Sequence, residues 1–180
     1  MTHPNSPTVG DYMTEVPATV ETGMILGDAL DRMYTDNIRH LPVVDERGAL
    51  VGVLSTRDVA VAAALRGLDP QEARVESVMA RAPYACAAES PLLEVIEHME
   101  RGRLGSVVVT RGGKPCGIFT TTDALRVLRG FLSGGPVEPL VHPTVTGGAE
   151  HPEHATGHPR AHGVRTKAHD SMVSWFLTRL

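Results

Sequence analysis

Apolar residues recur twice along the chain with the spacing of a buried helix face. In each set the four residues stand at positions i, i+3, i+4 and i+7, which places their side chains on one side of an α-helix. The sets are Leu26, Ala29, Leu30 and Met33, and Leu92, Val95, Ile96 and Met99. The pattern predicts two amphipathic helices, each packed by one face against a core.

Short apolar runs after each of these helices are typical of β-strands. The runs are LPVV and LVGVLS in the first half and SVVVT and CGIFT in the second half, joined by the turns DERG and RGGK. Because glycine tolerates positive φ in such turns, each pair of runs is predicted to form a β-hairpin. A short extended segment (PATV or PYAC) precedes each amphipathic helix, and a second helix is predicted to start at Asp58 and at Asp123. The resulting order, β-α-β-β-α, indicates an α+β fold.

The two halves also share sequence. GVLSTRDV at 52–59 returns as GIFTTTDA at 117–124, with Gly, Ser or Thr, and Asp at the same offsets. A long repeat that occurs twice predicts two copies of one small supersecondary unit rather than a solenoid. The predicted organisation is a flexible N-terminus (1–10), a first repeat (11–67), a linker (68–74), a second repeat (75–132) and a tail rich in His, Pro and Gly that ends in a short helix (133–180).

Composition and charge narrow the class of protein. The chain has 180 residues, of which 42% are hydrophobic and 4% aromatic, so a globular protein with an aliphatic core is expected. The net charge of −4 and the lack of a long basic run argue against a nucleic-acid-binding surface. No apolar stretch reaches the roughly 18 to 20 residues of a membrane span, and the polar N-terminus does not resemble a secretory signal. With only two cysteines, Cys86 and Cys116, a cytoplasmic location is expected.

The most faithfully repeated residues form a polar cluster, S/T-x-x-D, where a strand passes into a helix. Ser55 and Thr120 end the strands, and Asp58 and Asp123 begin the helices. The first turn of a helix offers unpaired N–H groups and a positive dipole, which together bind phosphate. A carboxylate accepts two hydrogen bonds and so matches the vicinal hydroxyls of a ribose. The cluster is interpreted as a nucleotide site, although Ser and Asp also serve as helix N-caps, and the two interpretations are compatible.

The segments YMTEVPATV and IRHLPVVDERGALVGVLSTRDV resemble a cystathionine-β-synthase (CBS) domain. VMARAP, GSVVV and GIFTTTDA resemble a second one, so residues 11–132 resemble a Bateman module of two tandem CBS domains. The resemblance implies two repeats packed around a pseudo-twofold axis, with clefts that bind AMP, ADP, ATP or a related adenosyl ligand. It also implies that modules pair into a homodimer.

Carried over position by position, the resemblance implies ligand contacts for three pairs of residues, one member in each repeat. The members of the first pair hold the ribose, those of the second lie beside the sugar and phosphate, and those of the third reach the phosphates. The pairs are Asp58 and Asp123, Ser55 and Thr120, and Arg57 and Thr122.

The resemblance assigns five further residues around the nucleotide. Arg39 and His40 match a basic pair that faces phosphate, and Pro42 matches a strand position near the base. Val16 and Ala82, which follow the two Met-Thr or Met-Ala segments, are implied to form the apolar wall of the adenine site.

The second repeat departs from this pattern. Gly105 and Ser106 stand where the first repeat has its basic pair, and Val108 replaces the proline. Hydrogen bonds to charged groups contribute about 1.5–3 kcal/mol each, so a phosphate that depended on this pair would bind less tightly. The two clefts are therefore expected to be unequal, with one of them favouring a phosphorylated ligand.

No enzyme motif is present in the sequence: there is no G-x-S-x-G, H-E-x-x-H, P-loop or G-x-G-x-x-G segment. The chain is expected to be a non-enzymatic regulatory module that requires no cofactor. An adenosine nucleotide would be its regulatory ligand, and binding would be signalled by conformational change to an unidentified target protein, without contact to nucleic acid or membrane. Arg126 and Arg129, one helical turn apart, are interpreted as a solvated face.

Two alternatives stay open at this point. The first is a structural or dimerisation scaffold that keeps the fold but has little affinity for ligand. The second is a metal-binding protein that uses the histidines of the tail, since imidazoles bind zinc. These histidines are His142, His151, His154, His158, His162 and His169.

Overall fold

The computed structural model describes residues 6–15 and 17–135. Two successive halves repeat the order strand, helix, two strands and helix, so the predicted α+β fold with two β-α-β-β-α repeats is confirmed. The first repeat contains η1 (Val9–Asp11), β1 (Thr14–Glu15), β2 (Val20–Glu21), α1 (Leu26–Thr35), β3 (His40–Val44), β4 (Leu50–Ser55) and α2 (Thr56–Arg66). The second repeat contains η2 (Val75–Ser77), β5 (Ala80–Arg81), β6 (Ala85–Cys86), α3 (Leu92–Gly102), β7 (Ser106–Arg111), β8 (Lys114–Thr120) and α4 (Thr121–Ser133).

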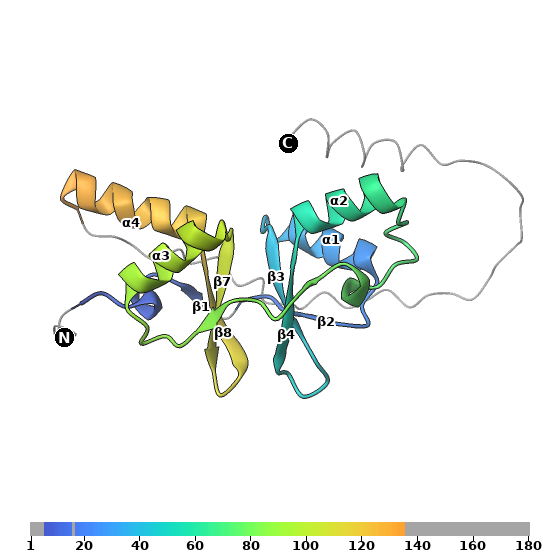
Figure 1. Cartoon of the computed structure of the whole chain (residues 1–180), viewed down its shortest axis with the longest axis horizontal. Coiled ribbons are helices and arrows are strands. Elements are labelled where there is room, and N and C mark those ends of the chain that lie inside the picture. Colours follow the sequence, from blue (N-terminus) through green and yellow to red (C-terminus); the bar gives the residue numbers. More distant parts are fainter. Residues whose placement is uncertain (1–5, 16, 136–180) are drawn as a thin grey trace, which may run out of the picture. The chain divides into compact units, whose positions relative to one another are not determined.

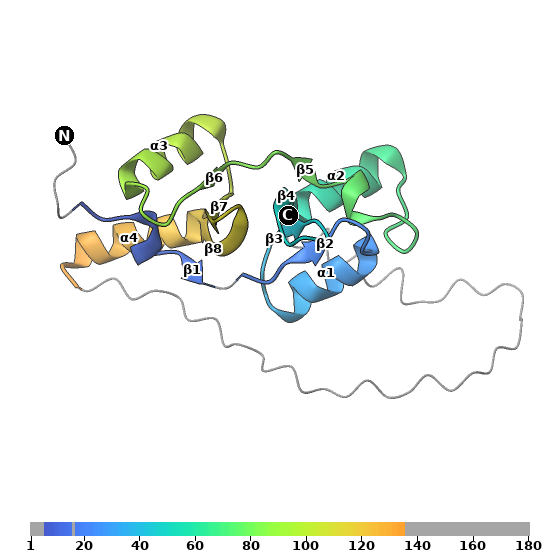
Figure 2. The same ribbon diagram turned by 90° about the horizontal axis from the view of Figure 1, so that it is seen from below.

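The predicted hairpins and amphipathic helices form as the sequence pattern indicates. β3 pairs with β4 and β7 pairs with β8, both antiparallel, and Gly48, Gly112 and Gly113 take positive φ in the two turns. Three of the four residues in each predicted stripe are buried, namely Leu26, Ala29, Met33, Leu92, Val95 and Met99. In Figures 1 and 2, α1 and α2 lie beside the sheet that contains β3 and β4, whereas α3 and α4 lie beside the sheet that contains β7 and β8.

The first strand of each repeat joins the sheet of the other repeat. One sheet has the strand order β2-β3-β4-β5, and the other has the order β1-β8-β7-β6. Thus β5, from the second repeat, pairs antiparallel with β4, and β1, from the first repeat, pairs antiparallel with β8. A backbone hydrogen bond from the amide of Leu50 to the carbonyl of Gly113 (3.0 Å) further connects the two hairpins. Neither sheet is complete without a strand from the other repeat.

The exchange extends to the two hydrophobic cores. The core of the first repeat includes Val75 and Met79 from the beginning of the second, and the core of the second repeat includes Val9 and Met13. Each methionine packs on a glycine of the sheet that its strand joins. A Cβ atom at Gly52 would stand 2.6 Å from the sulfur of Met79 and 3.0 Å from the carbonyl oxygen of Ala80. The glycines at 52 and 117, which recur in the sequence, therefore make room for the exchanged strand.

Candidate functional site

The S/T-x-x-D cluster of the first repeat forms a capping box at the start of α2. Ser55 is the N-cap residue and Asp58 is the third helical residue, so the helix begins at Thr56, two residues before the predicted start. The amide of Asp58 donates to Oγ of Ser55 (3.2 Å), and the amide and hydroxyl of Ser55 both donate to Oδ2 of Asp58 (3.1 and 2.6 Å). Two otherwise unpaired backbone N–H groups are satisfied in this way.

The second repeat builds the same capping box at the start of α4. The amide and hydroxyl of Thr120 donate to Oδ2 of Asp123 (2.7 and 2.6 Å), and the amide of Asp123 donates to Oγ1 of Thr120 (3.4 Å). Here too the helix begins two residues before the aspartate, at Thr121. The helix-capping role that the sequence offered for these residues is thus realised in both repeats.

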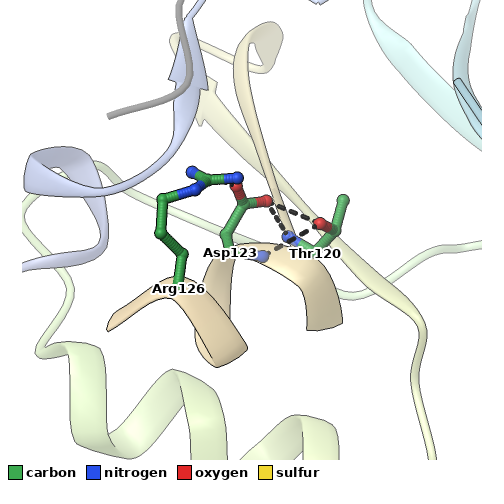
Figure 3. Close-up of polar contacts among 3 residues, drawn as sticks. All are labelled: Thr120, Asp123 and Arg126. Atoms are coloured by element: carbon green, nitrogen blue, oxygen red, sulfur yellow. Dashed lines mark hydrogen bonds and ion pairs between the residues drawn. The ribbon is translucent and has the colours of Figure 1, made fainter. Parts of the chain in front are cut away.

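Arg126 distinguishes the second capping box from the first. Its Nη1 atom donates to Oδ1 of Asp123 at 3.0 Å, and the two side chains are only 13% and 2% exposed (Figure 3). The interpretation of Arg126 as part of a solvated face was wrong, because its guanidinium is held inward by the buried carboxylate. Residues three apart on a helix are neighbours, so the spacing of Asp123 and Arg126 was a sequence signal for this pair.

Arg39 and His40 flank the start of α2. His40 pairs with Ser55 across β3 and β4, and the carbonyl of Arg39 accepts a hydrogen bond from the amide of Thr56 (3.1 Å). Burial is the main cause that lowers the pKa of the His40 imidazole below its ordinary value of 6.5, with Asp58 opposing this effect and Arg39 adding to it. The imidazole therefore tends to be neutral at pH 7, whereas the Arg39 guanidinium is exposed and remains charged.

The imidazole of His40 also reaches the second repeat. A Cβ atom at Gly105 would stand 3.0 Å from Nε2 of His40, and the carbonyl of Gly105 accepts a hydrogen bond from the amide of Thr121 (3.2 Å). Gly105 occupies the position that corresponds to Arg39, and its lack of a side chain leaves room for the ring. His40 therefore lies close to the starts of both α2 and α4.

The remaining candidate residues lie in different surroundings. Arg57 and Thr122 are exposed in the first helical turns, directly before the two aspartates. Pro42 is buried in β3 opposite Val53. Ala82 is exposed directly after β5 and has a φ of 50°, a left-handed conformation that is uncommon for alanine. Val16 lies outside the described residues.

The predicted chemistry of the tail also lies outside the described residues, because its histidines belong to 136–180. Within the described part of the chain, no group of three or more His, Cys, Asp or Glu side chains is placed to hold a metal ion. None of the helices in that part has both the length and the apolar character needed to cross a membrane.

Comparison with known proteins identifies the repeats. The model of the CBS domain family matches residues 9–64 and 75–130. A homoserine O-acetyltransferase from Methanococcoides burtonii is 31% identical over 121 residues, which are 67% of this chain but only 24% of that protein. The matched part of this chain spans about a quarter of the length of this protein and of two similar L-aspartate semialdehyde sulfurtransferases.

Two solved structures are similar over most of their length. One is a CBS domain pair in complex with 5′-methylthioadenosine and S-adenosyl-L-methionine, with 28% identity and a TM-score of 0.65, covering 70% of this chain and 98% of that chain. The other is CBSX2 of Arabidopsis thaliana in complex with AMP, with 26% identity and a TM-score of 0.60, covering 69% of this chain and 98% of that chain.

Proposed function

Because the chain belongs to the CBS domain family, we propose that it is a regulatory module that binds an adenosine nucleotide or another adenosyl ligand. The ligand occupies clefts between the two repeats, and its binding is transmitted to a partner protein. The ribose is held by Asp58 or Asp123, the sugar and phosphate adjoin Ser55 or Thr120, and the phosphates are reached by the residue before each aspartate. Those residues are Arg57 and Thr122.

The observation that carries this proposal is the pairing of a carboxylate with a helix N-terminus in each repeat. The positive end of the helix dipole at the first turns of α2 and α4 favours a phosphate, and the amides of Arg57 and Thr122 lie between the two paired amides of each turn. A carboxylate in the same turn offers hydrogen-bond acceptors to a ribose. At the start of α2, the exposed guanidinium of Arg39 adds a positive charge that suits an anionic ligand, and the imidazole of His40 lies on the neighbouring strand position.

The other assigned residues complete this proposal. Val16 and Ala82 form the apolar wall for the adenine, and Pro42 lies near the base. The complexes of two similar CBS domain pairs with AMP and with S-adenosyl-L-methionine support an adenosyl ligand. The enzyme names of the longer relatives do not extend to this chain, since it matches only about a quarter of their length.

The exchanged strands provide a physical route for signalling. Since β1 and β5 each belong to the sheet of the other repeat, a ligand that moves one repeat also moves the edge of the other sheet. His40 links the starts of α2 and α4 through its contact with Gly105. A ligand that binds one arrangement of the repeats more tightly shifts the population toward it, and a partner protein senses this arrangement.

A thermal-shift panel tests ligand binding. The full chain is heated with AMP, ADP, ATP, S-adenosylmethionine, NAD or Zn²⁺. A ligand present at about a hundred times its Kd adds about 2.7 kcal/mol to the free energy of unfolding, which raises the Tm by several degrees. The dideoxy analogue of AMP, which lacks both ribose hydroxyls, is the matched ligand control and is expected to give a much smaller shift.

Variants separate ligand binding from helix capping. Asp58→Asn and Asp123→Asn are compared with Asp11→Asn, because Oδ2 of Asp11 likewise accepts from the amide and hydroxyl of Thr8 and Asp11 is not among the proposed ligand contacts. Each variant is compared with its own Tm in the absence of ligand. We expect the ligand-induced shift to decrease in at least one of the first two variants and to persist in Asp11→Asn.

A scaffold without ligand is the second candidate function. It is favoured by the use of both aspartates in capping boxes, which gives each a purely structural role. If no adenosyl compound in the panel shifts the Tm, the function as a ligand-binding regulatory module is excluded and the function as a scaffold is supported.

The exposed helices of the second repeat support self-association into a homodimer. An apolar groove of about 860 Å³ lies between α3 and α4. Four large apolar side chains on these helices are between half and two-thirds exposed: Leu93, Leu125, Leu128 and Phe131. The positions on α2 that correspond to the last three are Ala60, Ala63 and Arg66. We propose that a second copy of the chain covers the groove and that its smaller α2 face accommodates the bulky side chains of α4.

A further inference from the structure

The two capping boxes differ in the residue that stands one helical turn beyond each aspartate. Three residues after Asp123 stands Arg126, whose Nη1 is 3.0 Å from Oδ1 of the carboxylate. Three residues after Asp58 stands Val61, which is 47% exposed. A valine forms no polar contact, so it leaves the corresponding oxygen of Asp58 without a cation from its own helix.

The number of free hydrogen-bond acceptor positions on each carboxylate decides whether that carboxylate can bind both hydroxyls of a ribose. A carboxylate has two oxygens and about four lone-pair positions. In both capping boxes Oδ2 already accepts two hydrogen bonds, from an amide and a hydroxyl. Oδ1 of Asp123 also accepts from Arg126, whereas within the described residues no hydrogen bond or ion pair reaches Oδ1 of Asp58. Asp58 thus keeps two acceptor positions, enough for both hydroxyls of a vicinal diol, and Asp123 keeps one.

Burial and charge strengthen this difference. Asp123 is 2% exposed, whereas Asp58 is only half-buried. A guanidinium stays charged at any physiological pH and its hydrogen bond to a buried carboxylate is strong, so Arg126 does not leave Asp123 readily. The basic group that faces Asp58 is the imidazole of His40, which lies on another element and does not occupy Oδ1.

We propose that Arg126 is a specificity-determining residue that closes the α4 site to a vicinal diol by occupying Asp123, so that a ribose-containing ligand binds at Asp58. This inference deepens the proposed function and rests on it. Arg126 acts through Asp123 and does not contact the ligand. The chain therefore binds one ribose-containing ligand, held by the first repeat, although it carries two copies of the aspartate motif.

Isothermal titration of the full chain with AMP and with S-adenosylmethionine tests the inference. We expect one ligand per chain, loss of binding in Asp58→Asn, and retained binding in Asp123→Asn. Arg126→Val, which copies the first repeat, is expected to raise the stoichiometry to two. The double variant Asp58→Asn/Arg126→Val is expected to regain the binding that Asp58→Asn loses. Arg129→Val removes an arginine from the same helix and is the matched control, with a stoichiometry of one.

Arg126→Val leaves a buried carboxylate without its partner and could therefore fail to fold. The reciprocal substitution, at Val61 of the first repeat, tests the same idea without that variant. Val61→Arg places the guanidinium three residues after Asp58, at an exposed position that tolerates a long side chain. It is expected to weaken binding at least about tenfold, the effect of one lost hydrogen bond to a charged group. A control, Val61→Gln, has similar length without the charge and is expected to weaken binding much less.

The outcomes distinguish the inference from the function on which it rests. If the wild-type chain and all variants bind neither AMP nor S-adenosylmethionine, and no adenosyl compound of the thermal-shift panel raises the Tm, the proposed function falls and the inference falls with it. If the wild-type chain binds but Asp123→Asn abolishes binding, or Val61→Arg leaves affinity unchanged, the function stands and the role of Arg126 is overturned. A loss of affinity in Arg126→Val without a second site would also overturn it, because Arg126 would then contact the ligand.

Discussion

The imidazole of His40, in the first repeat, lies on Gly105 of the second repeat. Gly105 is the residue that corresponds in sequence to Arg39 of the first repeat. The distance from Nε2 to a Cβ atom built at Gly105 is 3.0 Å, so any side chain there would displace the ring. The glycine that weakens the sequence pattern of the second repeat therefore has a packing role. It brings one basic residue of the first repeat close to the starts of both α2 and α4.

Acidification is expected to destabilise the fold through His40. Burial lowers the pKa of this imidazole in the folded state, whereas the unfolded chain has the ordinary value of 6.5. Between these two values the unfolded chain binds more protons, so the free energy of unfolding rises with pH. The contribution is complete above pH 6.5 and is lost as the pH falls below it. Urea denaturation between pH 5 and 8 measures this slope.

Two substitutions identify the histidine responsible. His40→Gln is expected to reduce the dependence of stability on pH in this window, because glutamine does not titrate. His98→Gln removes an exposed histidine that stacks on Tyr84 and serves as the control. An unchanged slope in His40→Gln would show that the histidine is not protonated on unfolding in this range.

A methyl group at Gly52 is expected to loosen the exchanged strand. It would stand 2.6 Å from the sulfur of Met79 and 3.0 Å from the backbone carbonyl of Ala80, and the second contact cannot be relieved by a side-chain rotation. Overpacking of this kind costs about 1–3 kcal/mol, so Gly52→Ala should lower the Tm by several degrees. Gly23→Ala is the control, since a Cβ atom at Gly23 would stand 3.8 Å from its nearest neighbour, Nη1 of Arg74. Equal Tm values for the two variants would contradict the packing argument.

The two repeats are expected to unfold as one unit. A fragment of residues 6–74 retains β2, β3 and β4 but lacks β5 and Met79, and its own β1 has no partner strand. A domain of this size is marginally stable even with a complete core, so the fragment should show no cooperative transition in circular dichroism. The chain of residues 1–135 should show a single calorimetric transition. Two resolved transitions would mean that the repeats fold independently.

A charge on α4 is expected to disrupt the proposed homodimer. Leu128 is 51% exposed on the apolar groove, and Leu128→Glu would place a carboxylate in a surface that the second copy buries. Light scattering after gel filtration should give a dimer for the full chain and a monomer for this variant. Arg47→Glu, in the turn between β3 and β4, is the control and should remain dimeric. A monomeric wild-type chain at micromolar concentration would exclude this use of the groove.

The unequal clefts predicted from Gly105 and Ser106 gain a second physical basis in Arg126. The sequence indicated a difference in basic residues, whereas the ion pair with Asp123 adds a difference in free acceptor positions. The spacing of this pair was available in the sequence, since residues three apart on a helix face each other. Arg126 and Arg129 are also three residues apart, so helical spacing alone does not decide whether the guanidinium of Arg126 shares an exposed face with Arg129 or turns to Asp123.

Local spacing by itself determined the helices, hairpins and capping boxes of this fold. The stripes that begin at Leu26 and Leu92, the glycines of the two turns, and the S/T-x-x-D clusters each act within a few residues, so their outcome depends little on distant parts of the chain. Only the tertiary structure decided which sheet receives β1 and β5, and that His40 lies on Gly105. Those contacts join residues that are far apart in the sequence, and no short-range pattern encodes which surfaces meet. They are selected by the burial of Met13 and Met79 and by the space that the glycines beneath them and beside His40 leave open.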